Sequence, residues 1–169
     1  MRIVEQFIAA IEPDDTEGES PITPILNRHK PTRTSADVDF LTTRRCHGTR
    51  RSHINQVVLD TQTWEQSACF WLEQSEDVEC YIRNDHRGLT IPYEYSGGGH
   101  NYEPDFIVRL KNRGHLILEI KGHETDQDRA KHAGAKRWVS AVSNWGEHGK
   151  WDFHVCRDPQ RLREELASV

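Results

Sequence analysis

The sequence predicts an α/β domain that follows an extended N-terminal linker. Two segments with apolar residues at helical spacing, 64–74 and 126–144, predict helices. Between them, short apolar stretches are separated by glycine-containing turns at 97–99 and 111–114, which is typical of an antiparallel meander. The expected order is therefore a helix, an antiparallel three-strand meander, a helix and a further strand.

Residues 1–36 predict a linker with a short N-terminal helix. Apolar residues at helical spacing run from 3 to 11 and stop at Pro13, and three further prolines follow before residue 32. Such a segment has too few aliphatic residues for a core of its own. We expect residues 37–169 to form the folded domain, with its first strands at 37–42 and 54–59.

The remaining elements are expected in the second half of the chain. Apolar density predicts the three strands of the meander at 89–95, 105–110 and 115–121. A strand at 151–156 would follow the second helix, and a short amphipathic helix at 159–167 would end the domain.

Composition excludes several classes of protein. The chain of 169 residues has 35% hydrophobic and 29% charged residues, which suits one globular domain. Its longest apolar run, residues 7–11, is far shorter than the roughly 20 residues of a membrane span. Four cysteines form no C-x-x-C pair, so reduced thiols are expected. We therefore expect a cytoplasmic protein with no membrane partner.

Positive charge is concentrated near the start of the domain. The net charge is −5, yet residues 28–53 contain seven Lys or Arg and two Asp, so this segment carries +5. One interpretation is a solvated linker, and the other is a basic arm that follows a DNA backbone. The candidate DNA contacts in this segment are Arg44, Arg45, Arg50 and Arg51.

Two carboxylates and a lysine are expected at one end of the meander. Asp105 opens one strand, and Glu119 and Lys121 close the next strand on a common face. In a hairpin, Asp105 and Glu119 would lie close together and repel each other unless a divalent ion such as Mg²⁺ is bound. A nearby lysine can orient or deprotonate an attacking water. The pattern predicts metal-assisted phosphodiester hydrolysis, although a solvated Glu–Lys ion pair is the simpler alternative.

The expected order resembles the PD-(D/E)XK nuclease superfamily, which has a restriction-endonuclease-like core. The resemblance extends to the C-terminal endonuclease domain of the Res subunit of type III, helicase-linked restriction enzymes, and covers residues 37–151. It lies in four segments: SHINQVVLDTQTWEQSACFWLE, IPYEYSGGGHNYEPDFIVRL, LILEIKG and KRWVSAVSNWGEHGKW. The implied function is a Mg²⁺-dependent deoxyribonuclease of restriction-modification and phage defence, with Mn²⁺ as a substitute ion, that yields 5′-phosphate and 3′-hydroxyl ends.

The resemblance implies specific roles. Asp105, Glu119 and the carbonyl of Ile120 would bind the metal, and Lys121 would be the catalytic lysine. Glu65 would be an acid of the first helix that contacts the metal through water, or else a glutamate favoured there by the helix dipole.

Three further residues are weaker candidates for function. Lys131 would reach the site or a phosphate, or would lie on the surface. His100 and Tyr102, in a Gly-rich loop, would contact DNA or remain exposed to solvent.

The resemblance also implies partners. Type III enzymes need an ATP-driven helicase and a methyltransferase subunit, and the turn at 97–99 lacks the G-K-[ST] of an ATP-binding loop. Both modules would act in trans, and the chain would be a split gene product, a fragment or a truncated remnant. Two alternatives stay open: a non-cleaving module that binds DNA or docks a subunit, and a metal hydrolase of small phosphoesters.

Overall fold

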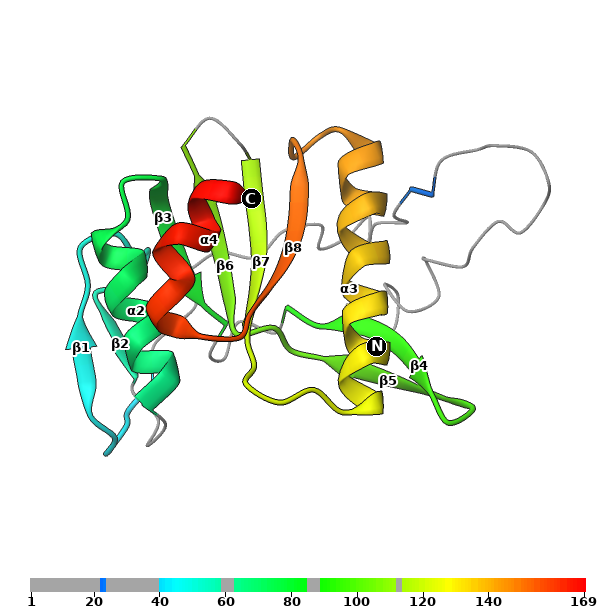
Figure 1. Ribbon diagram of the computed structural model, residues 1–169, viewed down its shortest axis with the longest axis horizontal. Coiled ribbons are helices and arrows are strands. Elements are labelled where there is room, and N and C mark those ends of the chain that lie inside the picture. The colour runs from blue at the N-terminus through cyan, green and yellow to red at the C-terminus, as the bar shows by residue number, and fades with distance from the viewer. Residues whose placement is uncertain (1–21, 24–39, 59–62, 85–88, 112–113) are drawn as a thin grey trace.

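The computed structural model describes residues 22–23, 40–58, 63–84, 89–111 and 114–169 (Figure 1). The helix expected at 3–11 and residues 37–39 of the first expected strand lie outside this part of the chain. Within it, the fold is mixed α/β, as the sequence predicts.

A four-stranded sheet forms the centre of the molecule, with the strand order β3-β6-β7-β8 (Figure 1). These strands are β3 (Val78–Arg83), β6 (Phe106–Leu110), β7 (Gly114–Ile120) and β8 (Trp151–Cys156). The pairs β3–β6 and β6–β7 are antiparallel, whereas β7 and β8 are parallel. A parallel neighbour needs a long crossover connection, and α3 (Asp126–Trp145) supplies it.

Helices cover both faces of this sheet. Alternate residues of β7 enter two separate hydrophobic clusters, because successive side chains of a strand point to opposite faces. Leu116 and Leu118 pack with α2 (Thr63–Gln74) and α4 (Leu162–Ser168), whereas Ile117 packs with α3.

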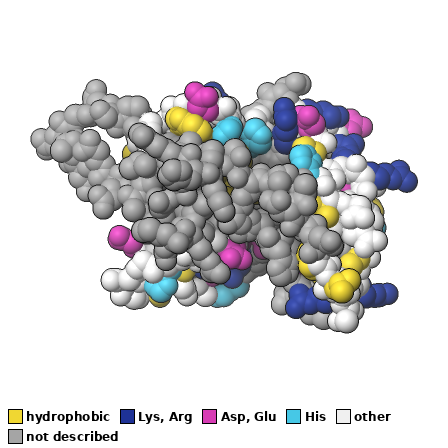
Figure 2. Space-filling view, turned by 180° about the vertical axis from the view of Figure 1, so that it is seen from behind, with side chains coloured by type: hydrophobic (Ala, Val, Ile, Leu, Met, Phe, Trp, Pro, Cys, Tyr) yellow, Lys and Arg dark blue, Asp and Glu magenta, His cyan; other side chains and the backbone are white. Residues whose placement is uncertain are grey.

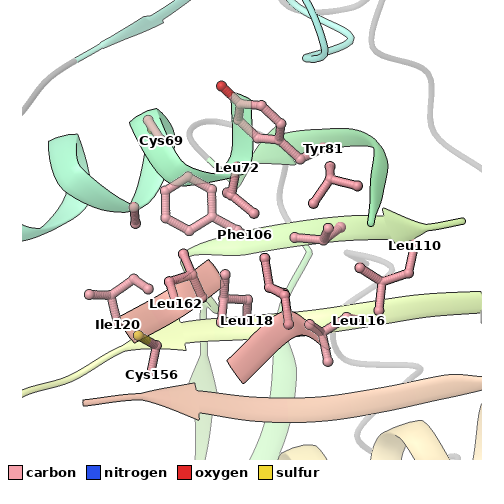
Figure 3. Packing of buried hydrophobic residues seen from close by; sticks show 14 of the residues in the cluster. Cys69, Leu72, Tyr81, Phe106, Leu110, Leu116, Leu118, Ile120, Cys156 and Leu162 are labelled. Atoms are coloured by element: carbon pink, nitrogen blue, oxygen red, sulfur yellow. The ribbon is translucent and has the colours of Figure 1, made fainter. Parts of the chain in front are cut away.

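Figure 3 shows the first cluster. Leu72 of α2 and Leu162 of α4 lie beside Phe106 and Leu118 of the sheet. Both faces of β7 are therefore buried, which fixes the position of the residues at its end.

A separate hairpin lies between β3 and β6 in sequence. It consists of β4 (Ile91–Tyr95) and β5 (Gly98–Tyr102) and forms its own two-stranded sheet. The expectation that residues 89–95 form the first strand of the meander is therefore wrong, because β3 pairs with β6 in that position. Ser96 and Gly97 both have positive φ values, which close a tight two-residue turn. The backbone thus pairs β4 with β5 and leaves β6 free for β3.

A second small hairpin precedes α2. It joins β1 (Cys46–Gly48) to β2 (Gln56–Val58). Of the strand expected at 54–59, residues 56–58 are confirmed, residues 54 and 55 are not in a strand, and residue 59 lies outside the described residues. β1 was not expected. Residues 40–42, expected at the end of the first strand, are not in a strand.

The helices follow the sequence pattern closely. α2 and α3 are confirmed, and the last segment folds as a 3₁₀ turn, η2 (Pro159–Arg161), followed by α4. Thr125 caps α3 through a capping box with Asp128, and Gly146 ends the helix in the left-handed conformation.

The cysteines form no disulfide among the described residues. Cys69 of α2 and Cys156 of β8 are buried in the core cluster between α2 and the sheet, Cys80 is partly buried and Cys46 is exposed. A bilayer-spanning helix would need a longer apolar stretch than any helix in the described part of the chain provides.

Candidate active site

The expected carboxylates and lysine converge at one edge of the central sheet. Asp105 immediately precedes β6, and Glu119 and Lys121 lie at the end of β7. The antiparallel register pairs Phe106 with Leu118, which brings Asp105 next to the end of β7. One carboxylate oxygen of Asp105, Oδ2, accepts a hydrogen bond from the main-chain N–H of Ile120 at 2.8 Å.

Burial perturbs both carboxylates. Glu119 is buried, with only 8% of its surface exposed. Desolvation raises the pKa of Glu119, and the neighbouring charge of Asp105 raises it further. Desolvation also raises the pKa of Asp105, against the opposing effects of the Ile120 N–H and of nearby Arg83 and Lys121. The two carboxylates therefore compete for one proton when no cation lies between them.

Tyr102 is the hydrogen-bond partner of Glu119. It is the last residue of β5, is 3% exposed, and donates its hydroxyl proton to Glu119 Oε2 at 2.7 Å. Burial raises the pKa of Tyr102, so the hydroxyl keeps its proton and remains a donor. The expectation that Tyr102 is a loop residue is wrong, because the loop closes into β5 and turns this side chain inward.

Lys121 directly follows β7 and its side chain contacts α3. Its Nζ is 3.3 Å from Asp128 Oδ1, and Lys131 Nζ is 3.1 Å from the same oxygen. The charge of Lys121 lowers the pKa of both Asp105 and Glu119. Lys131 thus reaches the edge of the site through Asp128.

Glu65 is connected to the site through an arginine. Its Oε2 lies 2.6 Å from Nη2 of Arg83, the last residue of β3, whose side chain is only 9% exposed. Arg83 also donates to the Val58 carbonyl, and its charge lowers the pKa of Asp105. The first-helix acid therefore faces the same end of the sheet as Asp105, with a buried guanidinium as its partner.

The other candidates lie in different surroundings. His100 is exposed on β5 and stacks on Tyr93 with ring centroids 5.5 Å apart. The guanidinium of Arg51 donates hydrogen bonds to the carbonyls of Ser75 and Val78, and so connects the segment before β2 to the start of β3.

The other three arginines named as candidate DNA contacts are exposed. Arg44, Arg45 and Arg50 have exposed side chains, and the main-chain N–H of Arg50 is hydrogen-bonded to the Glu73 carboxylate. Figure 2 shows Lys and Arg side chains along the right-hand margin, the side of the molecule where β1 and β2 lie.

Three residues of the site were not recognised from the sequence in these roles: Tyr102, Arg83 and Asp128. Arg83 and Asp128 are polar residues of types that are common on surfaces, and only tertiary structure shows that both are buried. One signal was available for Asp128, because Thr125 and Asp128 have the spacing of a capping box ahead of an amphipathic helix.

The carboxylate pair has the chemistry of a hard-cation site. Mg²⁺ prefers a few carboxylate oxygens and retains waters for its other positions. Asp105 and Glu119 supply such oxygens, and a divalent cation would offset both the burial of the two carboxylates and the charge of Asp105 that raises the pKa of Glu119. The described residues contain no cluster of three or more His, Cys, Asp or Glu side chains that could hold a metal.

No protein-family model, no curated protein and no solved structure matches this chain. Its function is therefore inferred from the arrangement of its own residues.

Proposed function

We propose that this chain is a metal-dependent DNA endonuclease domain of the type III restriction kind, which hydrolyses phosphodiester bonds. The observation that carries the proposal is the pairing of Asp105 and Glu119 at one edge of the sheet, with Lys121 beside them. The strand directions add support: an antiparallel meander, a crossover helix and a parallel strand are what a restriction-endonuclease-like core would have.

In this proposal Asp105, Glu119 and the carbonyl of Ile120 hold Mg²⁺, for which Mn²⁺ can substitute. When bound, the cation would polarise the phosphate and lower the pKa of a coordinated water. Tyr102 keeps the Glu119 carboxylate oriented by donating to Oε2. Burial of both carboxylates excludes bulk water and so strengthens their electrostatic interactions with bound groups.

Lys121 would act on the reacting phosphate. Its ammonium group can orient the attacking water and offset the negative charge that develops on the phosphate oxygens. Water would attack phosphorus and the 3′ oxygen would leave, with the proton of the water passing to the leaving oxygen or to solvent. The products would be a 5′-phosphate and a 3′-hydroxyl.

Nicking of supercoiled plasmid tests this function. The purified chain is expected to nick DNA with Mg²⁺ or Mn²⁺ and to lose this activity in EDTA. Lys121→Ala and Asp105→Asn should each lower the rate by roughly 100-fold or more, because each removes a group that contacts the reacting atoms or the metal. Lys136→Ala, which changes an exposed lysine of α3, is the matched control and should cleave normally. Equal rates in Lys121→Ala and the control would contradict the proposal.

A second candidate function is DNA binding or subunit docking without cleavage. It is favoured by the exposed side chains of Arg44 and Arg45, which suit a phosphate backbone. Salt-dependent binding of DNA by a folded protein that never nicks would support it. In both functions, a helicase module with ATPase activity and a methyltransferase subunit are proposed to act in trans by directing the chain to its site, a step that nicking of plasmid by the isolated chain does not require.

A further inference from the structure

The two carboxylate oxygens of Asp128 have different partners. Oδ2 accepts hydrogen bonds from the main-chain N–H and the hydroxyl of Thr125, at 3.0 and 2.7 Å. Oδ1 contacts the ammonium groups of Lys121 and Lys131. The first set caps α3, and the second set faces the candidate active site.

The capping role does not account for the lysine contacts. Asp128 is only 3% exposed, and a buried carboxylate is costly unless it is paired. Burial acts to raise the pKa of Asp128, but the hydrogen bonds from Thr125, Lys131 and Lys121 outweigh burial and hold this pKa below its usual range. Asp128 therefore remains ionised and provides a fixed negative charge next to the site.

Lys121 needs such an anchor. Its side chain is 35% exposed, and a lysine has a long flexible stem that favours solvent. Contact with Asp128 Oδ1 holds Nζ at the first turn of α3, from where its charge acts on Asp105 and Glu119. Because Lys131 lies on the same oxygen, two ammonium groups share one carboxylate oxygen at the edge of the site.

We propose that Asp128 is a positioning residue that holds Lys121 against the reacting phosphate, and that Lys131, held on the same oxygen, supplies a second cation for a phosphate of the bound DNA. This inference rests on the proposed function and deepens it. Asp128 itself touches neither the phosphate nor the metal, because it acts through the two lysines.

Two variants separate positioning from capping. Asp128→Asn keeps the shape and an acceptor for the Thr125 N–H but removes the charge that holds both lysines. Thr125→Ala removes the cap hydroxyl but leaves the carboxylate on Lys121 and Lys131. Both variants lose part of the capping box, so an effect found only in Asp128→Asn comes from the lysine contacts.

The first measurement uses the free protein. Proton–nitrogen NMR detects lysine ammonium groups whose exchange is slowed by an ordered contact, and Lys121→Arg and Lys131→Arg assign the two signals. We expect both signals in the wild type and in Thr125→Ala, and loss of both in Asp128→Asn. Retention of the Lys121 signal in Asp128→Asn would overturn the inference.

The second measurement is single-turnover cleavage of plasmid DNA, with substrate affinity determined separately. Asp128→Asn should lower the cleavage rate at saturating DNA by roughly 10- to 100-fold, as expected for a misplaced catalytic group, while Thr125→Ala cleaves like the wild type. Lys131→Ala should mainly weaken DNA binding. Equal cleavage by Asp128→Asn and Thr125→Ala would overturn this inference alone, whereas absence of cleavage by the wild type would overturn the proposed function.

Discussion

Glu119 shows how burial and charge act on one residue. It lies at the end of a strand buried on both faces, accepts a hydrogen bond from Tyr102 and faces the Asp105 carboxylate. Its folded-state pKa is raised above the ordinary 4.5. The folded protein therefore holds a proton that the unfolded chain releases at lower pH.

This pKa predicts a pH-dependent stability. Below about pH 4.5 glutamate is protonated in both states, so its contribution to stability is fully present there. That contribution is lost as the pH rises through the raised folded-state pKa, by up to about 1.4 kcal/mol per pH unit. We expect the metal-free protein to lose stability from pH 5 to pH 8, as measured by urea unfolding in EDTA. Added Mg²⁺ should restore stability at pH 8.

Glu119→Gln isolates this contribution. The variant should be more stable than the wild type at pH 8 without metal, and should show a smaller pH dependence and a weaker response to Mg²⁺. Part of the dependence of stability on pH should remain in this variant, because the pKa of Asp105 is also raised. Glu147→Gln, which changes an exposed glutamate, is the control. A pH dependence that is the same in all three proteins would contradict the electrostatic interpretation of the pair.

At the scale of elements, α3 both forms the crossover connection between β7 and β8 and positions the β4–β5 hairpin. A Cβ atom at Gly134 would lie 2.9 Å from both the Pro92 carbonyl oxygen and Tyr93 Cβ. The helix and the hairpin therefore meet almost backbone to backbone, and this contact supports the strand that ends at Tyr102.

Gly134→Ala should consequently destabilise the protein. Alanine is the better helix former by about 1 kcal/mol, but pushing the hairpin away from α3 is expected to cost about 1–3 kcal/mol. The variant should also weaken the hydrogen bond from Tyr102 to Glu119 and so reduce cleavage. Denaturant unfolding measures the first effect and plasmid nicking the second.

The opposite substitution one residue earlier is the control. Ala133 is exposed, so Ala133→Gly loses helix propensity alone and should leave cleavage unchanged. A net gain in stability for Gly134→Ala would show that the hairpin yields easily.

Local patterns predicted most elements but not their pairing. α2, α3 and β8 were predicted because helical spacing, capping residues and apolar density are properties of short windows. The place of β4 was predicted wrongly because two apolar segments precede β6, and pairing between distant strands decides which one joins the sheet. The turn falls at Ser96 and Gly97, which both have positive φ, so that β4 pairs with β5, and the sequence GGG alone does not reveal where the turn falls.

The same distinction applies to the site. Asp105, Glu119 and Lys121 could be placed together because one hairpin with a fixed register carries all three. Arg83 and Asp128 come from β3 and α3, and their burial depends on packing between elements that are separate in sequence. The pairing of Glu65 with Arg83 was likewise out of reach of sequence patterns.

At the scale of the whole molecule, charge is unevenly distributed. The chain has a net charge of −5, yet the exposed side chains of Arg44 and Arg45 provide local positive charge. Arg51, by contrast, is bonded to the carbonyls of Ser75 and Val78 and supports the fold. In the proposed DNA-binding function, the exposed Arg44 and Arg45 are the candidates for contact with a DNA backbone.

The double variant Arg44→Ala/Arg45→Ala should weaken DNA binding. The slope of log affinity against log salt is negative, and each lost phosphate contact reduces its magnitude by about 1. A reduction in magnitude of about 2 is therefore expected in fluorescence titrations from low to moderate salt. Arg163→Ala, at an exposed position of α4, should leave both affinity and slope unchanged. An unaltered salt slope in the double variant would remove this segment from the DNA contacts.

The two buried cysteines can report local opening of the protein through the rates at which their thiols are labelled. Cys69 and Cys156 lie on α2 and β8, on either side of one core cluster, so a thiol reagent reaches them only when that layer opens. Exposed Cys46 reacts without any opening and gives the reference rate of labelling for an accessible thiol. The rate at which a bulky reagent labels each buried thiol therefore follows how often its own element separates from the core. Without any engineered label, the chain can thus report whether the layer that supports Glu65 opens before, with or after the strand that lies beside Glu119.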